Sequence, residues 1–416
     1  MSAEDAIGPT RAVGASGRMR RGVIRRCGVA TRGVLRTDES VPGTGTEVTA
    51  VTNGRALPRQ EIRVTQTDQN GPRIDVHTGI GAIHASWHRL IEDARERVLL
   101  STYIVRDDSM GALIQDALLR AQKRSVRVDV LLDGFGNSRL WSRTRAQARD
   151  RWTSSGLRVR VHNPLRPGRS LKRANARNHR KVLIADDRAS IGSANVGWVR
   201  NLETQFEFAG DVVDELYRQM LSFLMTGHDA PNGKTDEPDA PLQLLLTGHG
   251  HAGRANRHAL LRLVESARSR LLILTPYFLP ERDETLAFLS ACRRGVDVRI
   301  LLPLRSNYPT LDRASRHLCR RLVDGGCTVL VRNGMFDHSK LAVADMQRSL
   351  VGSTNWDARS LRHNAEADLW VNGEPFAARL QEEFEARARF AHALTDTVSF
   401  PTRAMNALAA LATPAL

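Results

Sequence analysis

Two short segments of the chain carry the same chemically active residue types at the same spacing. In each segment a histidine is followed two positions later by a lysine and five positions after that by an aspartate: His179, Lys181, Asp186 and His338, Lys340, Asp345. The 416 residues include only 13 histidines and five lysines, so composition alone does not produce this pattern twice. Two imidazoles and two ammonium groups suit phosphodiester chemistry without a metal ion. One imidazole attacks phosphorus, the other protonates the leaving oxygen, and lysine stabilises the developing charge.

A second set of polar residues follows each of these segments. Gly-Ser-x-Asn and then Asn-x-Glu occur in both places: Ser193, Asn195, Asn201, Glu203 and Ser353, Asn355, Asn364, Glu366. We expect the serines and the first asparagine of each set to bind phosphate oxygens: Ser193, Asn195, Ser353, Asn355. We expect Glu203 and Glu366 to accept the distal N–H of an imidazole and so orient the histidines. The first copy has a shorter spacing before its glutamate, which leaves Glu207 as an alternative to Glu203 for the first histidine.

Asp186 and Asp345 complete the repeated pattern and belong to the candidate catalytic set. Each lies an odd number of positions after the lysine, and so on the opposite face of a strand. We therefore favour a structural salt bridge or cap for both aspartates over direct catalysis. A single histidine, serine or asparagine is more often a packed or turn-forming residue, but an ordered set that occurs twice argues for a site.

The surrounding sequence predicts an α/β fold that positions these residues. Helical stretches near 80–96 and 110–124 alternate with β-rich runs at 98–105, 126–133, 157–162, 181–186 and 204–210. In a strand, a histidine and a lysine two positions apart point to the same side and can converge on one ligand. The apolar runs 182–185 and 341–344 that follow the lysines suit strands buried on both faces.

The order of these elements repeats along the chain. ARERVLLSTY (94–103) resembles ARSRLLILTPY (267–277), and RSVRVDVLLD (124–133) resembles RGVDVRILLP (294–303). We expect two copies of one unit, 77–226 and 241–392, joined by a polar linker at 227–240, with the active site between them. Residues 1–76 are expected to form a basic, disordered tail rather than a membrane-surface helix, and 393–416 a short C-terminal tail.

Charge and composition limit the choice of partner and compartment. The formal net charge is +16, which favours a polyanion or an anionic membrane surface. The four cysteines show neither a disulfide framework nor zinc spacing, and no metal or other cofactor is expected. The chain lacks an apolar run of about 20 residues and a signal-peptide core, so we expect a cytoplasmic protein, peripheral on the inner face of the cell membrane.

The doubled pattern resembles the HKD motif of the phospholipase D superfamily. Within it, the segments STYIVRDDSMGALIQDALLRAQKRSVRVDVLLDGFG, TPYFLP and GSTNWDARSLRHNAEADL are most similar to bacterial cardiolipin synthases of phospholipase D type. The resemblance implies two homologous α-β-α sandwich domains related by a pseudo-two-fold, with the active site at their interface. It also implies that His179 is the nucleophile and His338 the general acid. The reaction would join two phosphatidylglycerol molecules and release glycerol.

Two other activities share the same catalytic residues. A phospholipase D-type phosphodiesterase would use water as the acceptor, and a nuclease of the superfamily would suit the positive charge. Aromatic residues are only 5% of the chain and no basic patch is interleaved with them, so nucleic acid is the less favoured partner. A scaffold without catalysis is disfavoured because neither motif has lost its histidine or lysine.

Overall fold

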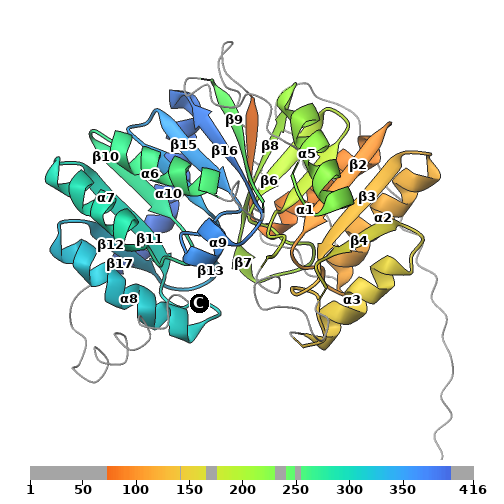
Figure 1. Cartoon of the computed structure of the whole chain (residues 1–416), viewed down its shortest axis with the longest axis horizontal. Coiled ribbons are helices and arrows are strands. Elements are labelled where there is room, and N and C mark those ends of the chain that lie inside the picture. Colours follow the sequence, from red (N-terminus) through yellow and green to blue (C-terminus); the bar gives the residue numbers. More distant parts are fainter. Residues whose placement is uncertain (1–72, 141, 165–175, 230–239, 249–253, 395–416) are drawn as a thin grey trace, which may run out of the picture. The chain divides into compact units, whose positions relative to one another are not determined.

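The computed structural model describes residues 73–140, 142–164, 176–229, 240–248 and 254–394, and this part of the chain forms two large β-sheets covered by helices (Figure 1). The first sheet has the strand order β1-β8-β6-β5-β2-β3-β4. Its strands are β1 (Ile74–Thr78), β2 (Arg97–Thr102), β3 (Arg127–Asp133), β4 (Arg158–His162), β5 (Val182–Ala185), β6 (Arg188–Gly192) and β8 (Thr204–Ala209). Strands β2, β3 and β4 run parallel, and the strands from β5 to β1 pair antiparallel.

The second sheet repeats this arrangement in the order β17-β12-β11-β10-β14-β15-β16-β9. Its strands are β9 (Leu242–Thr247), β10 (Arg270–Leu274), β11 (Asp297–Pro303), β12 (Thr328–Arg332), β14 (Leu341–Ala344), β15 (Arg348–Gly352), β16 (Glu366–Asn372) and β17 (Ala391–Ala393). Apart from β17, each strand has a counterpart at the same place in the first sheet. The repeat seen in the sequence is therefore a repeat of strand order and direction.

Helices cover both faces of each sheet and divide the apolar interior into three cores. One core joins the outer face of the first sheet to α1 (Ile80–Asp93), α2 (Ser109–Lys123) and α3 (Arg143–Thr153). The equivalent core of the second sheet includes α6 (Ala255–Ser266), α7 (Arg282–Arg293) and α8 (Pro309–Asp324). The central core holds α5 (Val212–Thr226), α10 (Glu374–Ala388) and the remaining face of both sheets. Each sheet is thus the middle layer of an α-β-α sandwich.

Local sequence explains these elements. In α1 the buried positions Ile80, Ile83, Trp87, Leu90 and Ile91 recur at the helical period and form one apolar face. Strands β5 and β14 are four-residue apolar runs in which every side chain is buried. The strands predicted at 98–105, 126–133, 157–162, 181–186 and 204–210 correspond to β2, β3, β4, β5 and β8, whose ends differ from the prediction by up to three residues. The predicted α/β class with two homologous sandwiches is confirmed.

The structure adds several features to the sequence prediction. Strand β1 begins at Ile74, before the expected start of the first copy at residue 77. The predicted N-terminal tail up to residue 72, most of the linker and most of the C-terminal tail lie outside the described residues. Within the described ranges, no helix is long and apolar enough to cross a membrane.

One edge of each sheet carries the repeated polar motifs. Ser101 of β2 pairs with Val182 of β5, and Leu274 of β10 pairs with Leu341 of β14. The carboxyl ends of β2, β3 and β4 therefore lie at the edge where β5 begins, and those of β10, β11 and β12 at the edge where β14 begins. These ends of the two sheets bear the residues just before β5 and β14. We refer to them together as the motif edge.

Candidate active site

Each of the two motif histidines contacts the half of the chain to which the other histidine belongs. The backbone N–H of His179 donates to the carbonyl oxygen of Ala365 at 2.9 Å, and that of His338 donates to Leu202 at 2.8 Å. Strand β13 (Phe336–Asp337), just before His338, pairs in parallel with β7 (Asn201–Leu202), and Figure 1 shows the two between the large sheets. Backbone pairing thus holds each histidine against the segment just before the other half's glutamate.

Each imidazole is oriented by a glutamate from the opposite half. Nδ1 of His179 lies 2.9 Å from both carboxylate oxygens of Glu366, and Nδ1 of His338 lies 3.0 Å from Oε2 of Glu203. Because a carboxylate only accepts hydrogen bonds, Nδ1 carries the proton and the lone pair is on Nε2. Neither Nε2 has a hydrogen-bond partner among the described residues. Both histidines are almost fully buried, with side chains 11% exposed, and present Nε2 as their reactive atom.

This arrangement corrects the choice between Glu203 and Glu207 for the first histidine. Glu366 orients His179, and Glu203 orients His338. Glu207 accepts instead from His77 of β1 at 3.0 Å and from Arg89 of α1, within the first half. The shorter spacing before Glu203 does not displace it.

The serines expected to bind phosphate hold the glutamates. Ser193 Oγ donates to Glu203 Oε2 at 2.5 Å, and Ser353 Oγ donates to Glu366 Oε2 at 2.6 Å. Both serines are fully buried, and each hydroxyl has a single proton, which the carboxylate accepts. In this arrangement the two hydroxyl protons go to the glutamates, and contact of these serines with a bound phosphate stays a prediction. Their contacts fix the glutamates that orient the histidines.

The four asparagines divide into two pairs. Asn201 and Asn364 donate Nδ2 to Oε1 of Glu203 and Glu366 at 3.4 and 3.2 Å. Asn195 Oδ1 accepts from the backbone N–H of Ile104 at 3.0 Å, which fixes its side chain and leaves Nδ2 as a donor. Oδ1 of Asn355 is buried without a hydrogen-bond partner in the described structure. Asn195 and Asn355 stay candidates for contact with a bound phosphate.

Lys181 and Lys340 are buried beside the histidines. The Nζ atoms donate to the carbonyl oxygens of His179 and His338 at 2.6 and 2.5 Å, which leaves each ammonium further N–H donors. Burial lowers the pKa of Lys181 well below its ordinary value, although Glu366 opposes the shift. Burial also lowers the pKa of Lys340 to about 8, again against the nearby glutamates. An anion bound between the two ammonium groups would restore the charge that burial disfavours.

The electrostatic surroundings of the two histidines differ. Burial lowers the pKa of His179 well below 6.5, and the charges of Lys181 and Lys340 lower it further. Burial also lowers the pKa of His338, but the carboxylate of Glu203 opposes that shift. Burial would raise the pKa of Glu203, yet His338, Lys340 and the bond from Ser193 outweigh it and the net direction is downward. Both pKa values are therefore lowered, that of His179 further, because the Glu203 carboxylate opposes the shift at His338.

Asp186 and Asp345 lie away from the histidines, at the far ends of β5 and β14. Asp186 accepts from the backbone N–H groups of Arg95, Glu96 and Arg97 at 2.7–3.0 Å. Asp345 makes the equivalent contacts with residues 268–270, at the start of β10. Both have a left-handed backbone, with φ of 51° and 54°, which aspartate tolerates better than most residues. The contacts match the structural role that we favoured for these aspartates.

Replacing Asp186 with alanine is expected to lower stability without removing the active site. The variant loses three backbone hydrogen bonds and places alanine in a left-handed conformation, so we expect a loss of about 2 kcal/mol. Urea unfolding measures this loss, and turnover of the folded variant at low temperature should stay within about threefold of the parent chain. A much larger fall in turnover with unchanged stability would contradict the structural role.

Two tyrosines beside the histidines were not among the predicted site residues. The ring of Tyr103 makes an edge contact with His179 at 5.2 Å between centroids, and Tyr277 makes a similar contact with His338 at 6.3 Å. Nζ of Lys181 lies 5.5 Å from the Tyr103 ring centroid. The sequence offers a signal for both, because two of its four tyrosines occupy matching places in the repeat, STY and TPY. These rings help to exclude water from the imidazoles.

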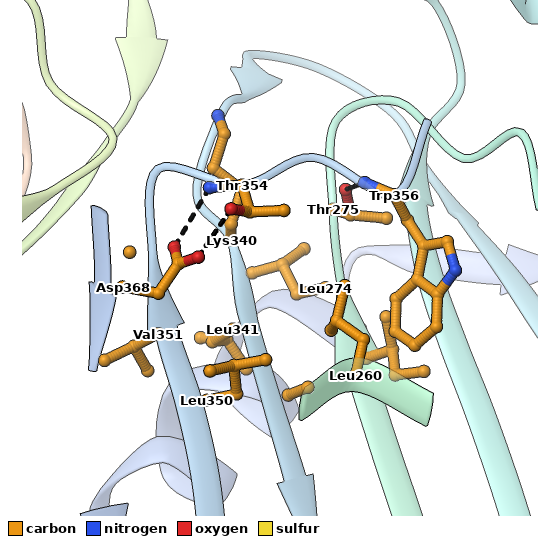
Figure 2. Close-up of a pocket in the computed structure, with 13 residues that line it drawn as sticks. Leu260, Leu274, Thr275, Lys340, Leu341, Leu350, Val351, Thr354, Trp356 and Asp368 are labelled. Atoms are coloured by element: carbon orange, nitrogen blue, oxygen red, sulfur yellow. Dashed lines mark hydrogen bonds between the residues drawn. The ribbon is translucent and has the colours of Figure 1, made fainter. Parts of the chain in front are cut away.

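The second half has a small, largely apolar pocket beside Lys340. Figure 2 shows Lys340, Thr354 and Asp368 on one side of it, with Leu260, Leu274 and Trp356 on another. Asp368 accepts from the Thr354 backbone N–H and side-chain hydroxyl at 3.1 and 2.5 Å. Burial raises the pKa of Asp368 to about 7. The equivalent residue in the first half is Gln205, so the two halves differ close to the site.

The described residues contain no cluster of three or more His, Cys, Asp or Glu side chains that could hold a metal ion. The positive charge near the histidines comes from Lys181 and Lys340, with Arg359 of α9 (Ala358–Arg362) contributing at His179. The arrangement can therefore supply a nucleophilic nitrogen, a proton donor and cations from its own side chains.

Known proteins are similar to this chain in sequence. The chain is 28% identical over 317 residues to cardiolipin synthase 2 of Bacillus cereus, a match that covers 71% of this chain and 60% of that protein. It is 27% identical over 324 residues to the major cardiolipin synthase ClsA of Bacillus subtilis, with 72% and 66% covered. The chain thus spans about 60% of the length of the first of these relatives.

A solved structure supports the fold. The crystal structure of phosphatidylserine synthase from Haemophilus influenzae superposes with a TM-score of 0.65 at 15% identity and covers 83% of this chain and 98% of that one. Residues 88–222 and 260–388 match the family described as cardiolipin synthase, PLD-like domain. These two matched ranges enclose both histidines, both lysines and both glutamates of the site. The chain therefore belongs to the family of cardiolipin synthase PLD-like domains.

Proposed function

We propose that the chain is a phosphatidyltransferase that makes cardiolipin from two phosphatidylglycerol molecules through a phosphohistidine intermediate. The observation that carries the proposal is the pair of buried imidazoles, each held at Nδ1 by a glutamate and each presenting Nε2. Family membership and the names of the curated relatives support the lipid reaction.

The first step forms a bond between His179 and phosphorus. Nε2 of neutral His179 attacks the phosphorus of phosphatidylglycerol, the bond to the glycerol oxygen breaks, and protonated His338 gives its proton to that oxygen. The lowered pKa of His179 keeps its lone pair free, and Glu203 supports the charge of His338. Glycerol leaves, and the phosphatidyl group stays on His179.

The second step reverses these roles. Neutral His338 takes the proton of the free hydroxyl of a second phosphatidylglycerol, whose oxygen attacks phosphorus while the bond to Nε2 of His179 breaks. Cardiolipin forms and both histidines return to their starting states. Lys181 and Lys340 stabilise the charge on the phosphoryl oxygens in both steps. The candidate phosphate contacts Asn195 and Asn355 lie in the segments that follow β6 and β15 at the same edge.

The substrate implies work at a membrane surface. Both phosphatidylglycerol and cardiolipin are anionic lipids, and the net charge of +16 favours an anionic bilayer. We propose that the protein acts on lipids in such a surface rather than on a soluble phosphodiester.

Lipid analysis tests the proposal directly. Purified protein is incubated with phosphatidylglycerol vesicles, and the products are identified by mass spectrometry. Cardiolipin and free glycerol in equal amounts are expected. Phosphatidic acid as the only lipid product would replace the synthase with a hydrolase, and cleavage of an oligonucleotide without any lipid product would replace it with a nuclease.

Activity is expected to survive an excess of chelator. The two buried lysines provide the positive charge that a metal ion supplies in other phosphoryl-transfer sites. The same lipid assay in EDTA should give a rate within about twofold of the untreated protein. Complete loss of product in EDTA that returns on addition of a divalent cation would contradict this role for Lys181 and Lys340.

A further inference from the structure

Large apolar side chains are exposed at the motif edge. Leu140 is 85% exposed, Phe390 67%, Met335 50%, Trp198 41% and Tyr308 37%. Single exposed apolar residues are common on protein surfaces, so exposure alone has little meaning. The position of these five is informative. We call them the apolar rim.

Strand directions place every member of the rim at this edge. Leu140 follows β3, and Trp198 follows β6, whose carboxyl end lies beside the start of β5. Tyr308 follows β11 and Met335 follows β12. Phe390 precedes β17, whose Ala391 pairs with Arg332 at the carboxyl end of β12.

The opposite edge is different. The described loops there, such as 94–96, 154–157, 267–269 and 345–347, contain none of the large apolar side chains with comparable exposure. The other exposed ones, Leu113, Met225 and Leu286, belong to helices α2, α5 and α7. Exposed apolar surface in the described loops is therefore confined to the edge that bears the two histidines.

Arginines accompany the rim. Each member has an arginine within three positions: Arg139, Arg200, Arg305, Arg332 and Arg389. Arg139 forms an ion pair with Asp150 at 3.6 Å, whereas Arg200 and Arg305 are exposed and make no ion pair within the described part of the chain. The guanidinium of Arg332 lies 5.8 Å from the centroid of the Phe390 ring. Apolar side chains beside unpaired cations are the composition that binds the boundary between anionic headgroups and acyl chains.

The rim also connects with the candidate active site. The ring of Tyr308 lies 5.8 Å from that of Tyr277, which itself contacts His338. The backbone N–H of Trp198 donates to Asp108 at 2.8 Å, so the loop after β6 is fixed to the loop after β2. A lipid headgroup held at this edge would lie beside the imidazoles.

We propose that the apolar rim and its arginines form a docking surface for an anionic lipid bilayer, with the rim side chains inserted at the level of the headgroups. The inference rests on the proposed lipid function and adds the face of the molecule that meets the membrane. Docking through this edge presents the histidines to the headgroup layer, so the substrate need not leave the bilayer completely.

The test compares two double variants that remove equally large apolar side chains. L140S/M335S removes two rim residues, and L113S/L286S removes two exposed leucines from helices. Binding is measured by co-sedimentation with phosphatidylglycerol-containing vesicles at low salt and in 1 M salt. We expect L140S/M335S to weaken binding about tenfold or more, and the control variant to bind within about twofold of the parent chain.

A second assay separates this inference from the proposed function. Short-chain phosphatidylglycerol below its micelle concentration is a soluble substrate, so L140S/M335S should turn it over at the parent rate. Absence of product from the parent chain with intact vesicle binding would contradict the function and not the docking surface. Equal vesicle binding by both double variants would overturn the docking surface. So would a rim-dependent self-association, measured by sedimentation velocity, in a protein that does not bind vesicles.

Discussion

Replacement of His338 with alanine is expected to reduce cardiolipin formation from phosphatidylglycerol by at least about 10³-fold, and the loss should depend on the leaving group. Glycerol is a poor leaving group and needs a proton from His338. In a phosphatidyl ester of p-nitrophenol the p-nitrophenolate group leaves without protonation, so its first release by the His338→Ala variant should slow far less, although further turnover still lacks His338 as the base.

The matching variant His179→Ala distinguishes the two roles. It removes the nucleophile, so release of both glycerol and p-nitrophenol should fall to the background rate. Initial rates with the two substrates give a leaving-group ratio for each protein. Equal losses for both substrates in His338→Ala would contradict the assignment of His338 as general acid.

Substitution of each glutamate is expected to cause the same kind of defect as substitution of the histidine that it contacts in the other half of the chain. Glu203→Gln removes the charge that supports protonated His338 and should reduce glycerol release about 10- to 100-fold, with a smaller effect on p-nitrophenol release. Glu366→Gln should slow both substrates by a similar factor, because it disturbs His179. The leaving-group ratio measures both effects in the assay described above.

Double variants check this pairing. Glu203→Gln should add little to His338→Ala, whereas Glu366→Gln should reduce the residual p-nitrophenol release of His338→Ala further. Glu207→Gln is the matched control: it loses contacts with His77 and Arg89 but should keep the parent leaving-group ratio. If Glu203→Gln instead resembled His179→Ala, each glutamate would serve the histidine of its own half.

Much of this architecture could be predicted from the sequence because local signals specify it. Buried strands are short apolar runs, and the repeated order of segments gave both copies of the unit. The spacing of two between histidine and lysine predicts that their side chains converge on one ligand, which stays a prediction, and the structure places both residues just before β5 and β14. The odd spacing of Asp186 indicated a separate location, and its contacts with Arg95, Glu96 and Arg97 explain why aspartate occupies that turn.

The cross-half contacts could not be predicted in this way. Spacing along the chain relates Glu203 to the first motif, but the pairing of β7 with β13 brings it to His338. The contact of the serines with the glutamates was not predicted either, because a hydroxyl next to a phosphate site and one next to a carboxylate have the same sequence pattern. Within the first half, the pairing of β6 with β8 brings Ser193 beside Glu203.

Location of the covalent phosphatidyl group tests the central claim most directly. The His338→Ala protein is mixed with the p-nitrophenol ester, quenched without acid, digested and analysed by peptide mass spectrometry. The account predicts a phosphatidyl group on His179, its accumulation in step with p-nitrophenol release, and no adduct on any residue of His179→Ala. An adduct on His338 in the His179→Ala protein would contradict the assigned roles. Release of p-nitrophenol by the His338→Ala protein without any adduct would contradict the phosphohistidine mechanism.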